Sequence, residues 1–133
     1  MIMPGMLHLP LVQALLKDNI QVCAQNCSAT GEGAFTGEVS CDHLQDYRIS
    51  HVLIGHNERR RQHNETQEIV NEKVKQAWDC SLNIVYCVGE TAEEREQERT
   101  DEVLEAQLSI LKEIEVDWSK TVIVYEPLWA MGT

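Results

Sequence analysis

The sequence predicts an α/β fold with a parallel sheet, because strand-like and helix-like segments alternate along its 133 residues. Four short apolar runs, rich in β-branched residues, begin near residues 20, 51, 82 and 121. Such runs suit strands that are buried on both faces. Amphipathic segments separate them, and this order implies right-handed crossovers within one sheet. Since no linker divides the chain, residues 1–133 are expected to form a single domain.

The first half of the chain is expected to contain two full strands, at residues 20–25 and 51–55. Residues 10–17 precede them as a short helix, because proline is tolerated in a first helical turn and the leucines share one face. A loop at residues 26–37 and one or two helical turns at residues 42–47 connect the strands.

The second half alternates strands with amphipathic helices. A helix is expected to begin at Asn64, because Gln67 follows it at the spacing of a capping box. Residues 82–88 form the third strand. Thr91 and Glu94 make a second capping box, which predicts the start of a long helix. The apolar face of that helix has helical spacing and consists of Leu104, Leu108, Leu111 and Ile114.

The formal net charge of −11 limits the class of partner. A surface this acidic repels phosphate groups, so neither nucleic acid nor an anionic membrane is an expected partner. Much of the charge lies in residues 90–115, whose acidic side chains fit a solvated helix face. No apolar run approaches the roughly 20 residues that a membrane span requires.

The cysteines and the N-terminal sequence indicate a cytoplasmic protein. Cys23 and Cys87 lie inside strand-like apolar runs, and no C-x-x-C pair is present. Buried, reduced thiols are therefore expected, and not a disulfide framework or a zinc site. The N-terminus MIMPGMLHLPLV lacks the basic segment and cleavage site of a signal peptide, so none is expected.

Two residues that directly follow strands carry the candidate chemistry. Glu126 ends the run TVIVY, and Pro127 after it has no N–H with which to extend a strand ladder. His56 follows the strand at residues 51–55. Since parallel strands end at one rim, where α/β proteins place their chemistry, the two side chains form a candidate general base and electrophile. Taken singly, such residues are more often a solvated acid and a structural histidine.

Other chemistries lack matching motifs. The glycines of the loop at residues 26–37 miss the spacing of a dinucleotide-binding loop. The histidines form no H-E-x-x-H zinc motif, and no G-x-S-x-G nucleophile motif is present. No metal ion and no cofactor are therefore expected.

Four stretches closely resemble signature stretches of the triose-phosphate isomerase family. They are AQNCSATGEGAFTGEVS at residues 24–40, GHNERR at 55–60, CVGET at 87–91 and YEPLWAMGT at 125–133. The resemblance implies a partial (βα)8 TIM barrel, from the end of its second strand to the lid after its sixth. It also implies interconversion of dihydroxyacetone phosphate and glyceraldehyde 3-phosphate through an enediol, in glycolysis and gluconeogenesis.

The resemblance further implies roles for particular residues. Glu126 matches the general base, and His56 matches the electrophile that polarises the carbonyl. The start of a helix directly after His56 would favour the neutral form of its imidazole. Glu58 matches a supporting acid beside the substrate-binding lysine. The remaining matches are the first lid hinge at Pro127, Leu128 and Trp129, the lid-tip glycine Gly132 whose N–H meets the phosphate, and Thr36 in the loop that docks into the partner subunit. The implied partners are a small phosphorylated triose and, at full length, a second subunit of a homodimer.

The sequence also departs from the family pattern. Asn57 stands where the family has serine, and residues 1–9 lack the Asn-x-Lys motif whose lysine neutralises substrate charge. A whole barrel needs about 250 residues. An alternative interpretation is therefore a truncated, non-catalytic fragment that at most interacts with intact isomerase subunits. Unpaired sheet edges and uncovered apolar faces would make the isolated chain unstable or prone to associate.

Overall fold

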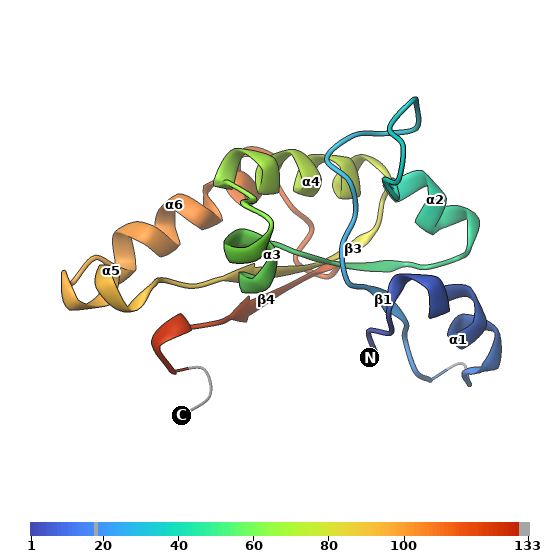
Figure 1. The fold of residues 1–133 in the computed structure, drawn as a ribbon, viewed down its shortest axis with the longest axis horizontal. Coiled ribbons are helices and arrows are strands. Elements are labelled where there is room, and N and C mark those ends of the chain that lie inside the picture. The colour runs from blue at the N-terminus through green and yellow to red at the C-terminus, as the bar shows by residue number, and fades with distance from the viewer. Residues whose placement is uncertain (18, 131–133) are drawn as a thin grey trace.

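The computed structural model describes residues 1–17 and 19–130, and a four-stranded parallel sheet lies at its centre (Figure 1). The strands pair in chain order, so each pairs with the next one along the sequence. They are β1 (Cys23–Ala24), β2 (His51–Ile54), β3 (Asn83–Val88) and β4 (Thr121–Tyr125). This arrangement confirms the predicted parallel α/β fold.

Helices connect the strands, and the two longest, α4 and α6, lie on the same side of the sheet (Figure 1). Both contact β3 in the middle of the sheet. The helical elements are η1 (Met6–His8), α1 (Leu9–Leu15), α2 (Cys41–Asp46), α3 (Asn57–Gln62), α4 (Gln67–Asp79), α5 (Ala92–Glu96), α6 (Thr100–Glu113) and η2 (Leu128–Ala130).

The hydrophobic core lies between the sheet and these two helices. Alternate residues of β2 and β3 pack there against the apolar face of α4, because successive strand side chains point to opposite faces. Each fully buried aliphatic side chain contributes about 1.5–3 kcal/mol relative to exposure. The central members are Val52, Ile54, Ile84, Tyr86, Val70, Val74 and Ala77.

The predicted start of α4 at Asn64 is wrong. Asn64 has a φ of 54°, a left-handed conformation that a right-handed helix does not contain. Thr66 caps the helix instead, and its side chain accepts a hydrogen bond from the N–H of Ile69. The helix therefore begins at Gln67, which the sequence prediction had placed inside the first turn.

The predicted long helix is divided in two. The capping box of Thr91 and Glu94 is present and starts α5, as expected. However, α5 ends at Glu96, and Glu98 has a φ of 58° that interrupts the helical path before α6. Leu111 is buried as predicted, and Leu104, Leu108 and Ile114 pack against the core while partly exposed.

The strand β4 is not buried on both faces, contrary to the prediction. Val122 is 53% exposed and Tyr125 is 47% exposed. The strand lies at the end of the sheet order, and no described strand pairs with its outer edge. The apolar sequence of β4 is therefore that of a central strand, although its position here is an edge.

The predicted burial of Cys23 and Cys87 is confirmed, and all five cysteines are free in the structure. Cys23, Cys27, Cys41 and Cys87 are buried, and Cys80 is partly exposed. In the part of the chain that the structure describes, no helix is long and apolar enough to cross a membrane. The same residues contain no group of histidine, cysteine and acidic side chains placed to hold a metal ion.

Candidate active site

His56 and Glu126 meet at the carboxyl-end rim of the sheet. The Nε2 atom of His56 lies 3.1 Å from Oε1 of Glu126. Their side chains are 26% and 15% exposed, so both remain accessible at the surface of the rim. His56 and Glu126 are far apart in the sequence, and the structure brings together these two residues, which were predicted from their positions at strand ends.

The position of His56 before α3 determines which nitrogen faces Glu126. His56 is the N-cap of α3, and its Nδ1 accepts a hydrogen bond from the N–H of Glu58 at 3.3 Å. A ring nitrogen that accepts a hydrogen bond carries no hydrogen itself. We infer that Nε2 carries the hydrogen and donates it to the carboxylate of Glu126.

The second oxygen of Glu126 is held by Asn57. The backbone N–H of Asn57 donates to Oε2 at 3.0 Å, and its side-chain Nδ2 donates to the same atom at 3.2 Å. Asn57 is only 7% exposed, which fixes both donors. Both oxygens of the Glu126 carboxylate are therefore engaged, one by His56 and one by Asn57.

Two glycines allow the strand ends to approach closely. A Cβ atom on Gly89 would lie 2.1 Å from the carbonyl oxygen of Glu126, so no other residue fits there. Gly55 has a φ of 77°, and a Cβ atom on it would meet the Cys87 carbonyl oxygen at 3.0 Å. The N–H of Glu126 continues the ladder beyond β4 by donating to Val88 O at 2.8 Å.

Arg60 joins the ends of two strands beneath the site. Its Nε donates to the carbonyl oxygen of Gly55 at 2.7 Å, and its Nη2 donates to that of Cys87 at 3.3 Å. Burial and the nearby charge of Glu126 raise the pKa of Cys87. The Cys87 thiol beside this carboxylate therefore stays protonated and neutral. Arg60 thereby fixes the spacing of the two segments that carry His56 and Gly89.

A buried carboxylate, Glu90, anchors the segment that follows Glu126. Glu90 is 0% exposed, and it accepts hydrogen bonds at 2.9 Å from the Tyr125 hydroxyl and from Nε1 of Trp129. The Arg95 guanidinium carbon lies over the Trp129 ring, 3.8 Å from its centroid. Burial alone would raise the pKa of Glu90, but the hydrogen bonds from Trp129 and Tyr125 outweigh burial and lower that pKa.

The expected lid hinge therefore begins from a fixed base. The N–H of Leu128 donates to the carbonyl oxygen of Glu90 at 3.2 Å, and η2 starts at Leu128 directly after Pro127. Trp129 is tied to the same glutamate through its indole. Gly132, the expected lid-tip glycine, lies outside the described residues.

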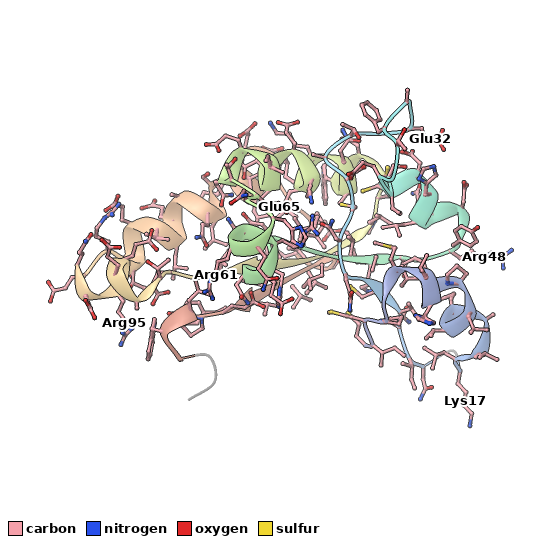
Figure 2. The ribbon with its side chains drawn as sticks, viewed as in Figure 1. Lys17, Glu32, Arg48, Arg61, Glu65 and Arg95 are labelled. Carbon is pink, nitrogen blue, oxygen red and sulfur yellow. The ribbon has the colours of Figure 1, made fainter. Side chains whose placement is uncertain are left out.

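A second buried network supports α3 from the side of α4. Glu65 lies in the connection between these helices (Figure 2). It contacts Arg59 at 2.6 Å and Lys73 at 2.5 Å. Lys73 also donates to Oδ1 of Asn26, at the start of the loop after β1, at 2.8 Å. Burial acts to raise the pKa of Glu65, but the hydrogen bonds and charges of Lys73 and Arg59 dominate and lower that pKa.

A cleft lined by both polar and apolar side chains, Met3 and Met6 among them, opens beside His56. It has a volume of about 570 Å³, and Gln25, Asn26, Leu53 and Arg59 line it together with His56 and Glu58. The Glu58 carboxylate lies 3.7 Å from Nδ1 of His56 and is 66% exposed. Thr36 lies elsewhere, on the exposed loop between β1 and α2.

The sequence prediction missed Gly89, Glu90 and Arg60. Glu90 follows the third strand after a single glycine, so the strand-end rule that selected Glu126 also applies to it. However, Glu90 is one of many acidic residues at positions 90–115, and these were interpreted together as the solvated face of a helix. Nothing in the sequence pattern marks Arg60 as the residue that joins β2 to β3.

Comparisons with known proteins show one family throughout. The family model described as triosephosphate isomerase matches residues 1–133. The glycosomal triosephosphate isomerase of Trypanosoma cruzi is 50% identical over 133 residues, covering 98% of this chain and 53% of that protein. The cytosolic triosephosphate isomerase of Oryza sativa subsp. japonica is 45% identical over 130 residues, covering 98% of this chain and 51% of that protein.

A third relative gives the same picture. The triosephosphate isomerase of Coprinopsis cinerea is 45% identical over 132 residues, covering 98% of this chain and 53% of that protein. The chain therefore spans about half the length of the curated relatives it matches. Because the family model matches the whole chain, and the sheet, strand order and rim are those expected of part of a (βα)8 TIM barrel, the chain belongs to the triosephosphate isomerase family.

Proposed function

We propose that Glu126 and His56 provide the base and the electrophile of a triosephosphate isomerase that interconverts dihydroxyacetone phosphate and glyceraldehyde 3-phosphate. The contact between Nε2 of His56 and Oε1 of Glu126, at 3.1 Å, is the observation that carries this proposal. An isomerisation through an enediol needs one group to move a proton between neighbouring carbons and another to stabilise the charge on oxygen. A carboxylate beside an imidazole N–H meets both needs.

In this mechanism, Glu126 removes a proton from the carbon next to the substrate carbonyl and returns it to the other carbon. The N–H at Nε2 of His56 donates to the oxygen on which negative charge develops. The hydrogen bond from Glu58 N–H to Nδ1 keeps the imidazole in the orientation that presents Nε2. The chemistry requires neither a metal ion nor a cofactor.

Substrate binding has to change the contacts of Glu126. Both of its oxygens are engaged, by His56 and Asn57, and a base needs one oxygen free to face the substrate carbon. We therefore expect the substrate carbonyl to replace Glu126 as the hydrogen-bond partner of His56. The cleft beside His56 is large enough for a small phosphorylated triose, but Glu126 does not line it, so the carboxylate would also have to turn toward this cleft.

The remaining site assignments belong to the same proposal. Pro127, Leu128 and Trp129 act as the first hinge of a lid, and Glu90 anchors it. Gly132 would donate its N–H to the substrate phosphate, and Glu58 would support the site as an acid. The exposed loop with Thr36 would dock into a partner subunit of a homodimer. A cytoplasmic location is proposed too, although one relative is named cytosolic and another glycosomal.

A coupled isomerase assay tests the proposal. Turnover by the chain that disappears in Glu126→Gln, which keeps the size of the side chain and removes the base, would support it. Glu105→Gln is the matched control, because Glu105 is an exposed residue of α6 and its loss leaves the rim intact. Equal turnover in Glu126→Gln and the unchanged chain would refute the assignment of the base.

A second candidate function is a non-catalytic role in which the chain binds intact isomerase subunits. The exposure of Val122 and Tyr125 on β4 favours it, because an apolar edge strand offers both backbone groups and apolar area to another chain. Mixing the chain with an intact triosephosphate isomerase and separating the species by size distinguishes the two functions. A stable mixed complex without turnover by the chain would support the second.

A further inference from the structure

Three thiols from separate segments meet beside the loop that connects β1 to α2. Cys27 follows β1, Cys41 is the first residue of α2, and Cys80 is the C-cap of α4. Cys27 and Cys41 are each 1% exposed and belong to the hydrophobic core, and the partly exposed Cys80 packs against that core. Both other thiols are close enough to influence the pKa of Cys41.

Neighbouring contacts hold Cys80 against α2. Its Sγ lies 3.6 Å from Oδ1 of Asp42, the residue that follows Cys41. The side-chain amide of Gln45, one turn further along α2, donates to the carbonyl oxygen of Cys80. The end of α4 is therefore fixed to the first turns of α2, which begin with Cys41.

We propose that Cys41 and Cys80 form an intramolecular disulfide when the protein meets a low-molecular-weight disulfide oxidant such as glutathione disulfide. Cys80 reacts first, because it is the partly exposed member of the cluster. Its thiolate attacks one sulfur of the oxidant, forms a mixed disulfide and releases one thiolate, which takes up a proton. The Cys41 thiolate then attacks the Cys80 sulfur and releases the second small thiol.

The reaction balances in atoms and electrons. Two protein thiols lose two hydrogens and two electrons, and one small disulfide is reduced to two thiols. Both Cys27 and Cys80 influence the Cys41 thiol, but only Cys80 is accessible enough to form the first mixed disulfide. Access therefore selects the pair of Cys41 and Cys80 over the pair of Cys27 and Cys41.

The environment of the pair makes the reaction slow at neutral pH. Burial, the Cys41 thiol and the Asp42 and Asp79 carboxylates raise the pKa of Cys80 to about 11. The contact with Cys27, followed by burial, raises the pKa of Cys41. Because only thiolates attack disulfides, the rate should rise with pH as both thiols ionise. At neutral pH the pair would respond to sustained oxidation and not to a brief pulse.

The cross-link would fix the end of an exposed loop. Residues 28–40 lead directly into Cys41, and residues 32–38 of that loop are exposed. A bond between Cys41 and Cys80 would tie this end of the loop to α4. It would also restrict the conformations of the unfolded chain, and this raises the free energy of unfolding. Formation of this disulfide depends on the position of the thiols and not on isomerase activity.

Peptide mapping tests the proposal directly. The chain is incubated with glutathione disulfide, its remaining thiols are alkylated, and the linked peptides are identified by mass spectrometry. We expect Cys41–Cys80 as the main linked pair and an upward shift of the thermal unfolding midpoint that dithiothreitol reverses. Cys80→Ser should abolish both effects. Cys23→Ala, a matched change at a buried thiol of β1, should retain both.

A parallel reaction in guanidinium chloride distinguishes the folded geometry from chance pairing. The unfolded chain should give a mixture of pairs, whereas the folded chain should give mainly the proposed one. The same mixture under both conditions would overturn the proposal. A dominant Cys27–Cys41 or Cys23–Cys87 bond, or mixed disulfides that never form a protein cross-link, would overturn it as well.

Discussion

Asn57 holds Glu126 with two hydrogen bonds to a single carboxylate oxygen, one from its backbone N–H at 3.0 Å and one from its side chain at 3.2 Å. The side-chain amide of Asn57 therefore adds a second donor to the backbone N–H, directly beside the proposed electrophile. Its contribution is measurable apart from activity.

We predict that Asn57→Ala lowers the free energy of unfolding by about 1–2 kcal/mol. The substitution removes one donor to a charged, partly buried acceptor and leaves the backbone donor in place. Urea unfolding measures the change. Asn19→Ala is the control, because Asn19 is exposed and its loss should fall within about 0.5 kcal/mol of zero. An equal effect in both variants would contradict a role for the Asn57 side chain.

Gly89→Ala should be among the most damaging single changes in the chain. The added Cβ atom would lie 2.1 Å from the carbonyl oxygen of Glu126, so the end of β4 must move away from β3. We expect a loss of about 3 kcal/mol or more, because backbone cannot yield as a flexible side chain does. Gly5→Ala is the matched control, since the nearest atom to its Cβ would be a His8 side-chain atom at 3.7 Å. A stable Gly89→Ala variant would show that the strand ends are more loosely spaced.

The losses of stability on removing Lys73 and Glu65 should not be additive. Lys73→Met leaves the Glu65 carboxylate buried with Arg59 as its remaining charged partner, and we expect a loss of about 2–4 kcal/mol. In the double variant with Glu65→Gln, the loss should be smaller than the sum of the two single losses. A double-mutant cycle by urea unfolding measures this coupling. Strictly additive losses would contradict a direct interaction.

Acid should destabilise the fold through Glu65 and Glu90. The folded state lowers the pKa of both carboxyl groups, so each contributes stability above its unfolded pKa of about 4.3. That stability is lost as the pH falls through the lower, folded pKa. We predict that Glu90→Gln flattens the acid side of the stability profile, whereas Glu105→Gln on exposed α6 leaves it unchanged. An unchanged acid profile in Glu90→Gln would contradict the depressed pKa.

The exposed strand β4 should cause the isolated chain to associate. Val122 lies on the sheet face opposite α4 and α6, in register with Val85, and is 53% exposed. We expect sedimentation velocity to show species whose size grows with concentration. Val122→Lys, which places a charge on that face, should shift them toward monomer. A monomer that melts in one sharp transition at all concentrations would contradict this expectation.

The strands, the helices and the strand ends that carry the site could be predicted from the sequence, because each depends on residues that are neighbours in the chain. Alternating apolar runs and helices give a parallel sheet, and the rule that parallel strands share one rim brings His56 and Glu126 together. The predicted start of α4 is wrong because Asn64 and Thr66 are both residues that favour the N-cap position, and the backbone conformation selects between them. The same applies to Glu98, whose positive φ divides the predicted long helix.

The parts that sequence did not predict depend on contacts between distant segments. Glu90 looks like one acid among many until Tyr125 and Trp129, 35 and 39 positions away, donate to it. The exposure of β4 cannot be read from its residues, since Val122 and Ile123 are as apolar as those of a buried strand. A hydrophobic pattern indicates what a strand is suited to contact, and the exposure of β4 depends on which elements pack beside it.

Proton exchange into the substrate is the most direct measurement of the proposed pairing of Glu126 and His56. Dihydroxyacetone phosphate is incubated with the chain in D2O, and deuterium at the carbon next to the carbonyl is followed by NMR. The proposed roles predict incorporation by the unchanged chain, none above background in Glu126→Gln, and a marked reduction in His56→Gln. Incorporation at an equal rate in Glu126→Gln, or none by the unchanged chain, would contradict them.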